Sequence, residues 1–375
     1  MLQNKQQIKV RNSSIELLRI IAMIMIVFHH FAIHGGFTFG ASISITYLWY
    51  NLIVMGGKIG VDVFVIISGY YLITDEKPIF NINRIIKFVG QILFYSVVVF
   101  FVGGLAGFGD FGAKSVIKVF FPITFSKWWF ASTYFVLYLI HPFINKLLNS
   151  MDKLLYQKFL LVLVTCWSVI PTFTTSSYQG NSLLWFVTLY SISGYVRLYG
   201  LNNKLTIKHY FILWIVCSFL TYASSVLFIV LGNKWSIFAE HATYFYGQEK
   251  VTILLISLSL FMIFATLKMN HCKWINVLAS VTFGVYLLHD NDIARKFLWD
   301  NLFNNAQYQD SLFLIPYSIV AVVAVYAVCT CFDLLRQSFF EKPFMILVNC
   351  YSEKMIKPVE MILNAAKSVI FGEGN

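Results

Sequence analysis

Charged residues are scarce in this chain, and their scarcity argues against a water-soluble protein. Only 12% of the 375 residues are charged and 58% are apolar, whereas a soluble domain carries roughly 25% charged residues to cover its surface. No polar stretch is long enough for a second, soluble domain, and the sequence has no Walker loop and no CxxC pair. These absences argue against P-loop nucleotide-binding folds and thiol-redox folds.

Long apolar runs are present instead, and a bilayer-spanning helix needs about 20 mostly apolar residues. We therefore predict an all-α integral membrane protein. Residues 1-13 would be a cytoplasmic N-terminus, residues 14-335 a ten-helix transmembrane domain, and residues 336-375 a cytoplasmic tail. The ten predicted spans are about 14-33, 50-73, 85-108, 128-148, 154-172, 183-199, 209-232, 250-268, 274-291 and 312-335.

The placement of lysine and arginine predicts the orientation of these helices. With the N-terminus inside the cell, 20 of the 28 basic residues fall on the inner side and 7 in outer loops, while Lys58 lies within a span. Such an excess is typical of the cytoplasmic side, so we predict that both termini are cytoplasmic. Because the net charge of +11 is explained by topology, we expect no nucleic-acid partner.

The tail repeats apolar residues at three- and four-residue steps between Lys354, Lys357 and Lys367. This pattern predicts a C-terminal amphipathic helix on the inner leaflet, with membrane lipids as its partner. The six cysteines fall in spans, in a cytoplasmic loop or in the tail, so no disulfide framework is predicted.

The first span carries ionisable residues, each of which costs roughly 2.5 to 3.5 kcal/mol at mid-membrane. Arg19 and His30 share one helical face with Glu16 and His34. At 1.5 Å per residue, Arg19 and His30 lie roughly 16 Å apart along the axis, one near the cytoplasmic interface and the other near mid-membrane. Alternatively, Arg19 reaches the lipid headgroups or pairs with Glu16, and His30 bonds a neighbouring helix. We favour a functional pair.

The second span contains Asp62, which lies at about the depth of His30 on the antiparallel neighbour. An aspartate bonded to one imidazole nitrogen would fix the tautomer and stabilise the imidazolium. In the alternative interpretation, Asp62 pairs with Lys58 one turn away on the same helix.

Two later spans also carry a histidine on a polar, aromatic stripe. One stripe includes Tyr138 and His141, and the other includes Tyr286 and His289. Three histidine-bearing stripes suggest one polar cavity inside the bundle. We expect no metal in it.

Four segments resemble the membrane acyltransferase family 3, whose members O-acylate surface polysaccharides and related acceptors. They occur in family order across about residues 13 to 340, and departures include a small basic segment after the second span and a histidine where a small residue is usual. The segments are Glu16-Leu-Leu-Arg19 with His30 (Arg-x10-His), Gly60-Val-Asp62 to Ser68-Gly69-Tyr70, Trp129 to Asn145, and Ser280 to His289.

The resemblance implies an O-acyltransferase in the plasma membrane of a bacterium. It would move an acyl group, most simply acetyl, from cytoplasmic acetyl-CoA to a hydroxyl of a cell-surface or lipid-linked polysaccharide. His30 would be the general base and Asp62 would orient it. The donor would be bound by Arg19, Arg84, Lys87, Ser68 and Tyr70, and the acceptor by Tyr138, His141, Tyr286 and His289.

Three alternatives stay open at this point. The acyl group could pass through a covalent acyl-His30 intermediate. The chain could be a transporter or lipid-linked sugar flippase, although no inverted repeat is visible. Its buried polar residues could also serve only to specify packing in a structural or sensory membrane protein.

Overall fold

The computed structural model describes residues 11-40, 43-75, 81-108, 111-178, 180-202, 204-351 and 361. The regular secondary structure of these residues is entirely helical, with no strand among them, which confirms the all-α prediction. The predicted amphipathic helix of the tail lies largely outside the described residues. The elements, with η for 3-10 or π turns, are α1 (Ser13–Ile33), α2 (Ile45–Leu72), α3 (Ile82–Leu105), α4 (Ala113–Phe120), α5 (Trp129–Asn149), α6 (Lys153–Val164), η1 (Thr165–Val169), α7 (Ile170–Phe173), α8 (Ser182–Tyr199), α9 (Ile207–Gly232), α10 (Ser236–Glu240), η2 (Tyr244–Tyr246), α11 (Val251–Thr266), α12 (Lys273–Ser280), α13 (Thr282–His289), α14 (Asp292–Lys296), η3 (Phe297–Leu302), η4 (Asn305–Tyr308), α15 (Leu314–Arg336) and η5 (Gln337–Glu341).

Seven helical segments of the described chain are long and apolar enough to cross a membrane, and each overlaps a predicted span. The segment Ser236–Thr266 begins before the span predicted at 250-268, and Leu314–Tyr351 runs past residue 335 into the predicted tail. The second of the seven begins five residues earlier than predicted, because Ser44 caps it by accepting a hydrogen bond from the Tyr47 amide at 3.0 Å. The seven segments are Ser13–Ile33, Ile45–Leu72, Ile82–Leu105, Lys153–Phe173, Ile207–Gly232, Ser236–Thr266 and Leu314–Tyr351.

The other three predicted spans are not among these seven segments. The spans predicted at 128-148 and 183-199 are the helices α5 and α8. The span predicted at 274-291 is not one helix: it breaks at Val281 into α12 and α13, of eight residues each. Since about 20 residues are needed to cross a bilayer, neither half is long enough, and ten crossings stay a prediction.

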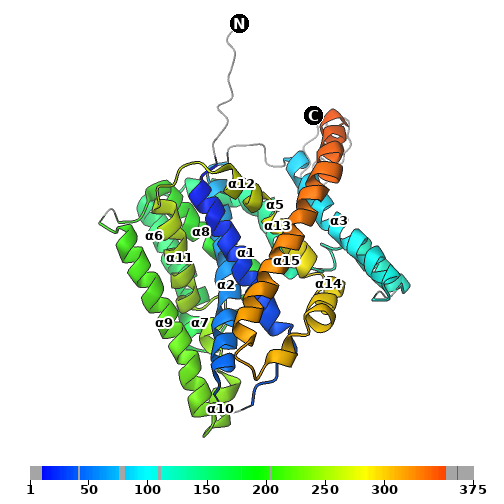
Figure 1. The fold of residues 1–375 in the computed structure, drawn as a ribbon. Coiled ribbons are helices and arrows are strands. Elements are labelled where there is room, and N and C mark those ends of the chain that lie inside the picture. The colour runs from blue at the N-terminus through cyan, green and yellow to red at the C-terminus, as the bar shows by residue number, and fades with distance from the viewer. Residues whose placement is uncertain are drawn as a thin grey trace.

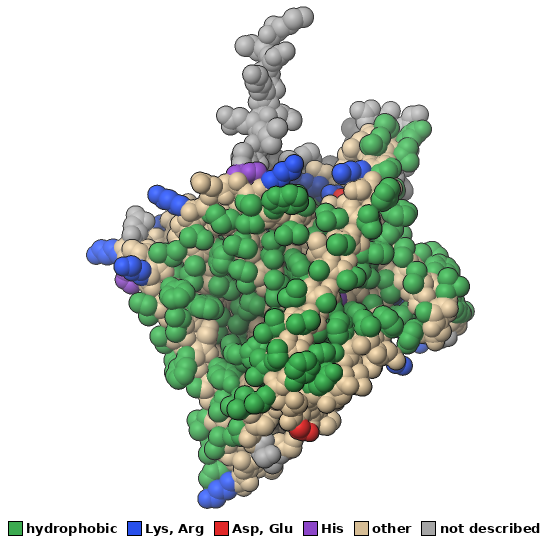
Figure 2. Space-filling model, viewed as in Figure 1, with side chains coloured by type: hydrophobic (Ala, Val, Ile, Leu, Met, Phe, Trp, Pro, Cys, Tyr) green, Lys and Arg blue, Asp and Glu red, His purple; other side chains and the backbone are tan. Residues whose placement is uncertain are grey.

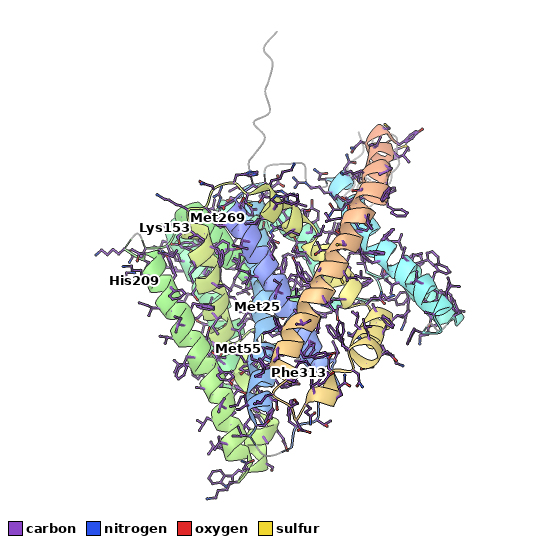
Figure 3. All side chains as sticks on the ribbon, in the orientation of Figure 1. Met25, Met55, Lys153, His209, Met269 and Phe313 are labelled. Carbon is purple, nitrogen blue, oxygen red and sulfur yellow. The ribbon has the colours of Figure 1, made fainter. Side chains whose placement is uncertain are left out.

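The centre of the bundle is the antiparallel pair α1 and α2, with α8, α11 and α15 packed around it (Figure 1). Met25 and Met55 lie near mid-height of the molecule (Figure 3). The two helices approach closely because small residues line the contact: a Cβ on Gly60 would come within 2.6 Å of the Ala22 carbonyl oxygen.

The ends of the helices alternate between two sides of the molecule. Lys153, His209 and Met269 lie near one edge and Phe313 lies toward the other (Figure 3). The start of α1 is on the same side as the first three (Figure 1). Hydrophobic side chains cover the flank between these edges, and Lys and Arg gather along the edge that holds the start of α1 (Figure 2). This surface suits a multi-pass membrane protein.

Candidate functional site

A cavity of about 430 Å³ lies beside α1 at the centre of the bundle. Arg19 and His30 both line it, as the stripe on the first span predicts. His34 lines it as well, fifteen residues from Arg19, so the cavity follows α1 for roughly 22 Å at 1.5 Å per residue. The opposite walls come from α2, α5, α13 and α14, with Ser68, Tyr134, Tyr286, Asp290 and Arg295 among the polar side chains.

A hydrogen-bond relay fixes the protonation pattern of His30. The Val285 carbonyl can only accept, so Nδ1 of His289, at 2.6 Å, must donate to it. Nε2 of His289 therefore carries a lone pair and accepts from Nδ1 of His30 at 2.8 Å. This leaves Nε2 of His30 unprotonated, which is the state that a general base requires.

The carboxylate next to His30 is Asp290, whose Oδ1 lies 3.6 Å from Nδ1 of the imidazole. Arg295 holds this carboxylate through Nη1 at 3.3 Å, and its Nη2 also bonds Asp292 at 2.9 Å. Asp290 is therefore placed to stabilise an imidazolium on His30. Burial and the charge of Arg295 lower the pKa of the neighbouring His34 to about 4, so that ring is neutral at pH 7.

Asp62 is not the partner of His30 that the sequence predicted. It is fully buried, and its Oδ1 accepts a hydrogen bond from Nε1 of Trp185 at 3.1 Å. Asp62 and His30 were predicted at equal depth on neighbouring helices, but equal depth alone does not bring two side chains into contact. Whether Asp62 points toward α1 depends on how α2 is rotated about its axis, and residue spacing does not give that rotation. Lys58 interacts electrostatically with Asp62, in line with the alternative interpretation.

The predicted donor-binding residues are divided by the fold. Arg19 lines the cavity, and its buried Nε meets no hydrogen-bond acceptor within the described residues. Ser68 also lines the cavity, where its hydroxyl accepts from Tyr134 at 3.1 Å. The other three predicted donor-binding residues, Arg84, Lys87 and Tyr70, lie outside the cavity.

Arg84, Lys87 and Tyr70 each bind another side chain away from the cavity. Arg84 pairs with Asp75 at 2.7 Å and Lys87 with Glu341 at 2.7 Å. Tyr70 accepts a hydrogen bond from Nη1 of Arg197 at 3.2 Å, and the guanidinium lies over its ring. None of the three lines the cavity, so the prediction that they share one donor site with Arg19 is not supported by their positions.

The predicted acceptor residues are divided in the same way. Tyr286 lines the cavity, and His289 is buried behind His30 as its hydrogen-bond acceptor. Tyr138 and His141 instead contact each other, with ring centroids 4.9 Å apart, and do not line the cavity. They lie one and two turns beyond Tyr134 along α5, toward the end that the sequence predicts to be cytoplasmic.

Three groups of the site have the distances of a cation site. The candidate ligand atoms of His30, His34 and Asp290 all lie within 4.8 Å of one another. However, His30 already donates to His289, and Arg295 already holds Asp290. Two of the three groups thus already have partners in the protein.

Asp290 and Arg295 were missed by the sequence analysis. Asp290 directly follows His289 in the sequence. This position beside a predicted site histidine is a signal that could have identified Asp290 as a site residue. Arg295 falls between the spans predicted at 274-291 and 312-335, and nothing in its spacing indicates that the short helix α14 places it beside the cavity.

Comparison with known proteins supports the resemblance read from the sequence. A family model described as an acyltransferase domain, that of the membrane acyltransferase family 3, matches residues 12–334. No curated protein and no solved structure matches the chain.

Proposed function

Because this chain belongs to the membrane acyltransferase family 3, and its helices suit a multi-pass membrane protein, we propose that it is an O-acyltransferase that uses acyl-CoA to acylate a hydroxyl of a surface glycan. The observation that carries this proposal is one continuous cavity with Arg19 and His30 on the same wall. A purely structural protein has no need for an imidazole held in the base tautomer beside a hydrogen-bonded carboxylate, and the family match supports an acyltransferase over a transporter.

The donor would enter at the Arg19 end of the cavity. A guanidinium with an unpartnered, buried N–H is a suitable group for the phosphates of coenzyme A. The pantetheine arm is neutral and narrow, so it fits a mostly apolar channel along α1 and carries the thioester toward His30. We assign donor binding at the cavity to Arg19 and Ser68, and the basic residues Arg84 and Lys87 to the inner surface.

The transfer step follows from the tautomer of His30. Nε2 takes the proton of the acceptor hydroxyl as the oxygen attacks the thioester carbonyl. The tetrahedral intermediate then expels the coenzyme A thiolate, which receives the proton back from the imidazolium. Such general-base assistance is typically worth about 10²- to 10⁴-fold in rate. Asp290, rather than Asp62, would stabilise the imidazolium, and Tyr286 would face the reacting carbonyl.

The acceptor would reach His30 from the other end of the cavity, where His34, Asp290 and Arg295 lie. With the predicted orientation, this end faces the cell exterior, where surface polysaccharides and lipid-linked glycans are found. The donor and acceptor thus meet inside the membrane, and the apolar walls exclude the water that would hydrolyse the thioester.

The test compares the surface glycans of a deletion strain with those of strains that carry the intact gene or the His30→Ala variant. Proton NMR of the glycans should show acetyl resonances only with the intact gene. As a matched control, His241→Ala removes an exposed histidine outside the cavity and should restore acetylation fully. Full acetylation with the His30→Ala variant would overturn the proposal.

A further inference from the structure

A second cavity, of about 350 Å³, shares no lining residue with the first. It is formed by the loop between α7 and α8 together with the residues just before α11. Both segments belong to predicted outer loops, so the cavity would open on the side where the acceptor arrives. Its polar and aromatic lining includes Trp167, Trp185, Ser177, Asn181, Gln248 and Glu249.

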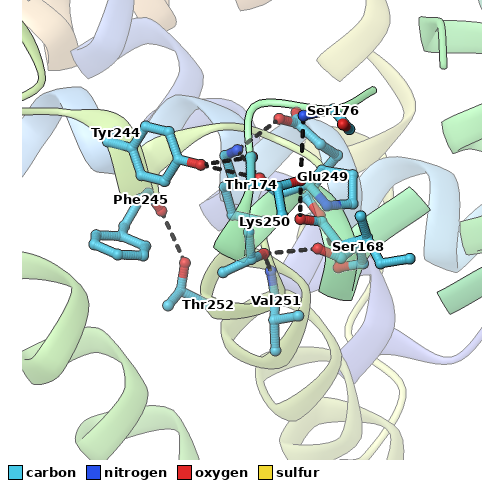
Figure 4. Close-up of polar contacts among 12 residues, drawn as sticks. Ser168, Thr174, Ser176, Tyr244, Phe245, Glu249, Lys250, Val251 and Thr252 are labelled. Carbon is cyan, nitrogen blue, oxygen red and sulfur yellow. Dashed lines mark hydrogen bonds and ion pairs between the residues drawn. The ribbon is translucent and has the colours of Figure 1, made fainter. Parts of the chain in front are cut away.

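The walls of this outer cavity are fixed before any ligand arrives (Figure 4). The Ser168 hydroxyl donates to the Glu249 carbonyl at 2.7 Å. The Tyr244 hydroxyl donates to the Thr174 carbonyl at 2.9 Å. These bonds join two segments that are 70 and 81 residues apart in the chain at the two contacts. Little ordering entropy is therefore lost when a ligand binds.

Among the described lining residues, the two charged side chains, Glu249 and Lys250, are paired with each other. Lys250 is buried, and its ammonium group donates to the Pro171 carbonyl, lies 3.5 Å from Glu249 and sits 4.2 Å from the centre of the Tyr244 ring. Its charge is thus balanced within the wall. A phosphate or carboxylate would have to displace these contacts, so a neutral ligand is favoured.

Trp167 supplies an unused donor. It lies on the π-helix η1, which precedes Pro171; proline lacks the amide that would continue the helical hydrogen bonding, and π turns re-aim side chains at functional sites. In the described part of the chain, the buried Nε1 of Trp167 meets no acceptor.

The lining combines two indoles with amide and hydroxyl groups, and this combination suits a sugar ring. The C–H face of a pyranose packs on an indole, while its hydroxyls exchange hydrogen bonds with amides, hydroxyls and the indole N–H. A purely apolar ligand would leave these polar groups unpaired.

A wall of polar residues separates this cavity from the catalytic one. Lys58 lines the catalytic cavity and Trp185 lines the outer one. Asp62 lies fully buried between them, bonded to Trp185 and attracted to Lys58. The buried aspartate thus has a role in holding this wall together.

We propose that the outer cavity is a carbohydrate-binding subsite that holds a neutral pyranose unit of the acceptor other than the unit that is acylated. This inference rests on the proposed function only for the identity of the glycan. The subsite would raise affinity for polymeric over monomeric acceptors without touching the reacting atoms.

The test measures saccharide binding to the full-length protein in detergent, without acyl-CoA. The probes are oligosaccharides cut from the surface polysaccharide of the source cells after removal of O-acetyl groups by mild base. Trp167→Ala should weaken binding about tenfold, and Trp167→Phe, which keeps the packing and removes the N–H, should weaken it by a smaller factor. Trp235→Ala, a matched control on an exposed outer tryptophan, should bind as the unaltered protein does.

The His30→Ala variant separates the two proposals. In the His30→Ala background, Trp167→Ala should still weaken saccharide binding about tenfold, because Trp167 lines the other cavity. Saccharide binding without acyl transfer by the unaltered protein would contradict the proposed function alone. Acyl transfer that proceeds with unchanged acceptor KM in both Trp167 variants, or the absence of any saccharide binding, would overturn the subsite.

Discussion

Nδ1 of His30 lies 2.8 Å from Nε2 of His289, and this contact joins the first span to the second-to-last predicted one. The Val285 carbonyl fixes the tautomer of His289, and His289 in turn fixes that of His30. A backbone carbonyl thus determines which nitrogen of the candidate base is free. The relay explains why two buried imidazoles can lie in contact without repulsion, since both are neutral.

The relay predicts a graded response at His289. His289→Ala removes the acceptor of His30 and should lower kcat about 10²-fold, because the free imidazole samples the wrong tautomer. His289→Gln offers an amide oxygen at a similar place and should recover part of the loss. The measurement is the acetyl transfer rate at saturating donor and acceptor. Equal rates for His289→Ala and the unaltered protein would contradict the relay.

Substitutions of two buried carboxylates test which of them supports His30: Asp290, as the structure indicates, or Asp62, as the sequence predicted. Asp290→Asn removes the negative charge 3.6 Å from His30 and should lower kcat, because the imidazolium loses its counter-charge. Asp62→Asn keeps an acceptor for Trp185 and should change kcat less. Both rates are measured with the same donor and acceptor. A larger loss of kcat in Asp62→Asn would return the orienting role to Asp62.

The donor site makes a prediction for the basic residues. Arg19→Gln should raise the KM for acyl-CoA by about 10- to 100-fold, since a hydrogen bond to a charged group is worth about 1.5–3 kcal/mol. Arg84→Gln is the matched control: its guanidinium is already paired with Asp75, so the KM should rise much less. Initial rates at varied acyl-CoA give both values. The reverse order would place the donor at the inner surface and not in the cavity.

Close packing between α2 and α8 makes a prediction for stability. A Cβ on Gly69 would lie 2.2 Å from the Ser193 hydroxyl oxygen and 2.9 Å from the Tyr190 Cα. Gly69→Ala should therefore destabilise the protein by about 1–3 kcal/mol, the usual cost of overpacking. Gly40→Ala has no heavy atom within 4 Å of the new Cβ and should leave Tm unchanged. Thermal unfolding in detergent provides the comparison, and an unchanged Tm in Gly69→Ala would be inconsistent with this contact.

The sequence determined the membrane character of the chain and seven of its spans. It also determined that Arg19 and His30 lie on the same wall of the cavity. These features depend on composition and helical periodicity, which are local and can be read along a single helix. The same periodicity placed Tyr286 and His289 on one stripe, although the helix that carries them breaks at Val281.

Only the tertiary structure decided which groups from different helices meet. His30 contacts His289 and Asp290 rather than Asp62, and Arg84 and Lys87 are neutralised away from the cavity. Such contacts depend on the rotation of each helix about its axis and on where short helices such as α14 turn back. Those quantities are set by packing among several helices at once, and no spacing within one segment contains them.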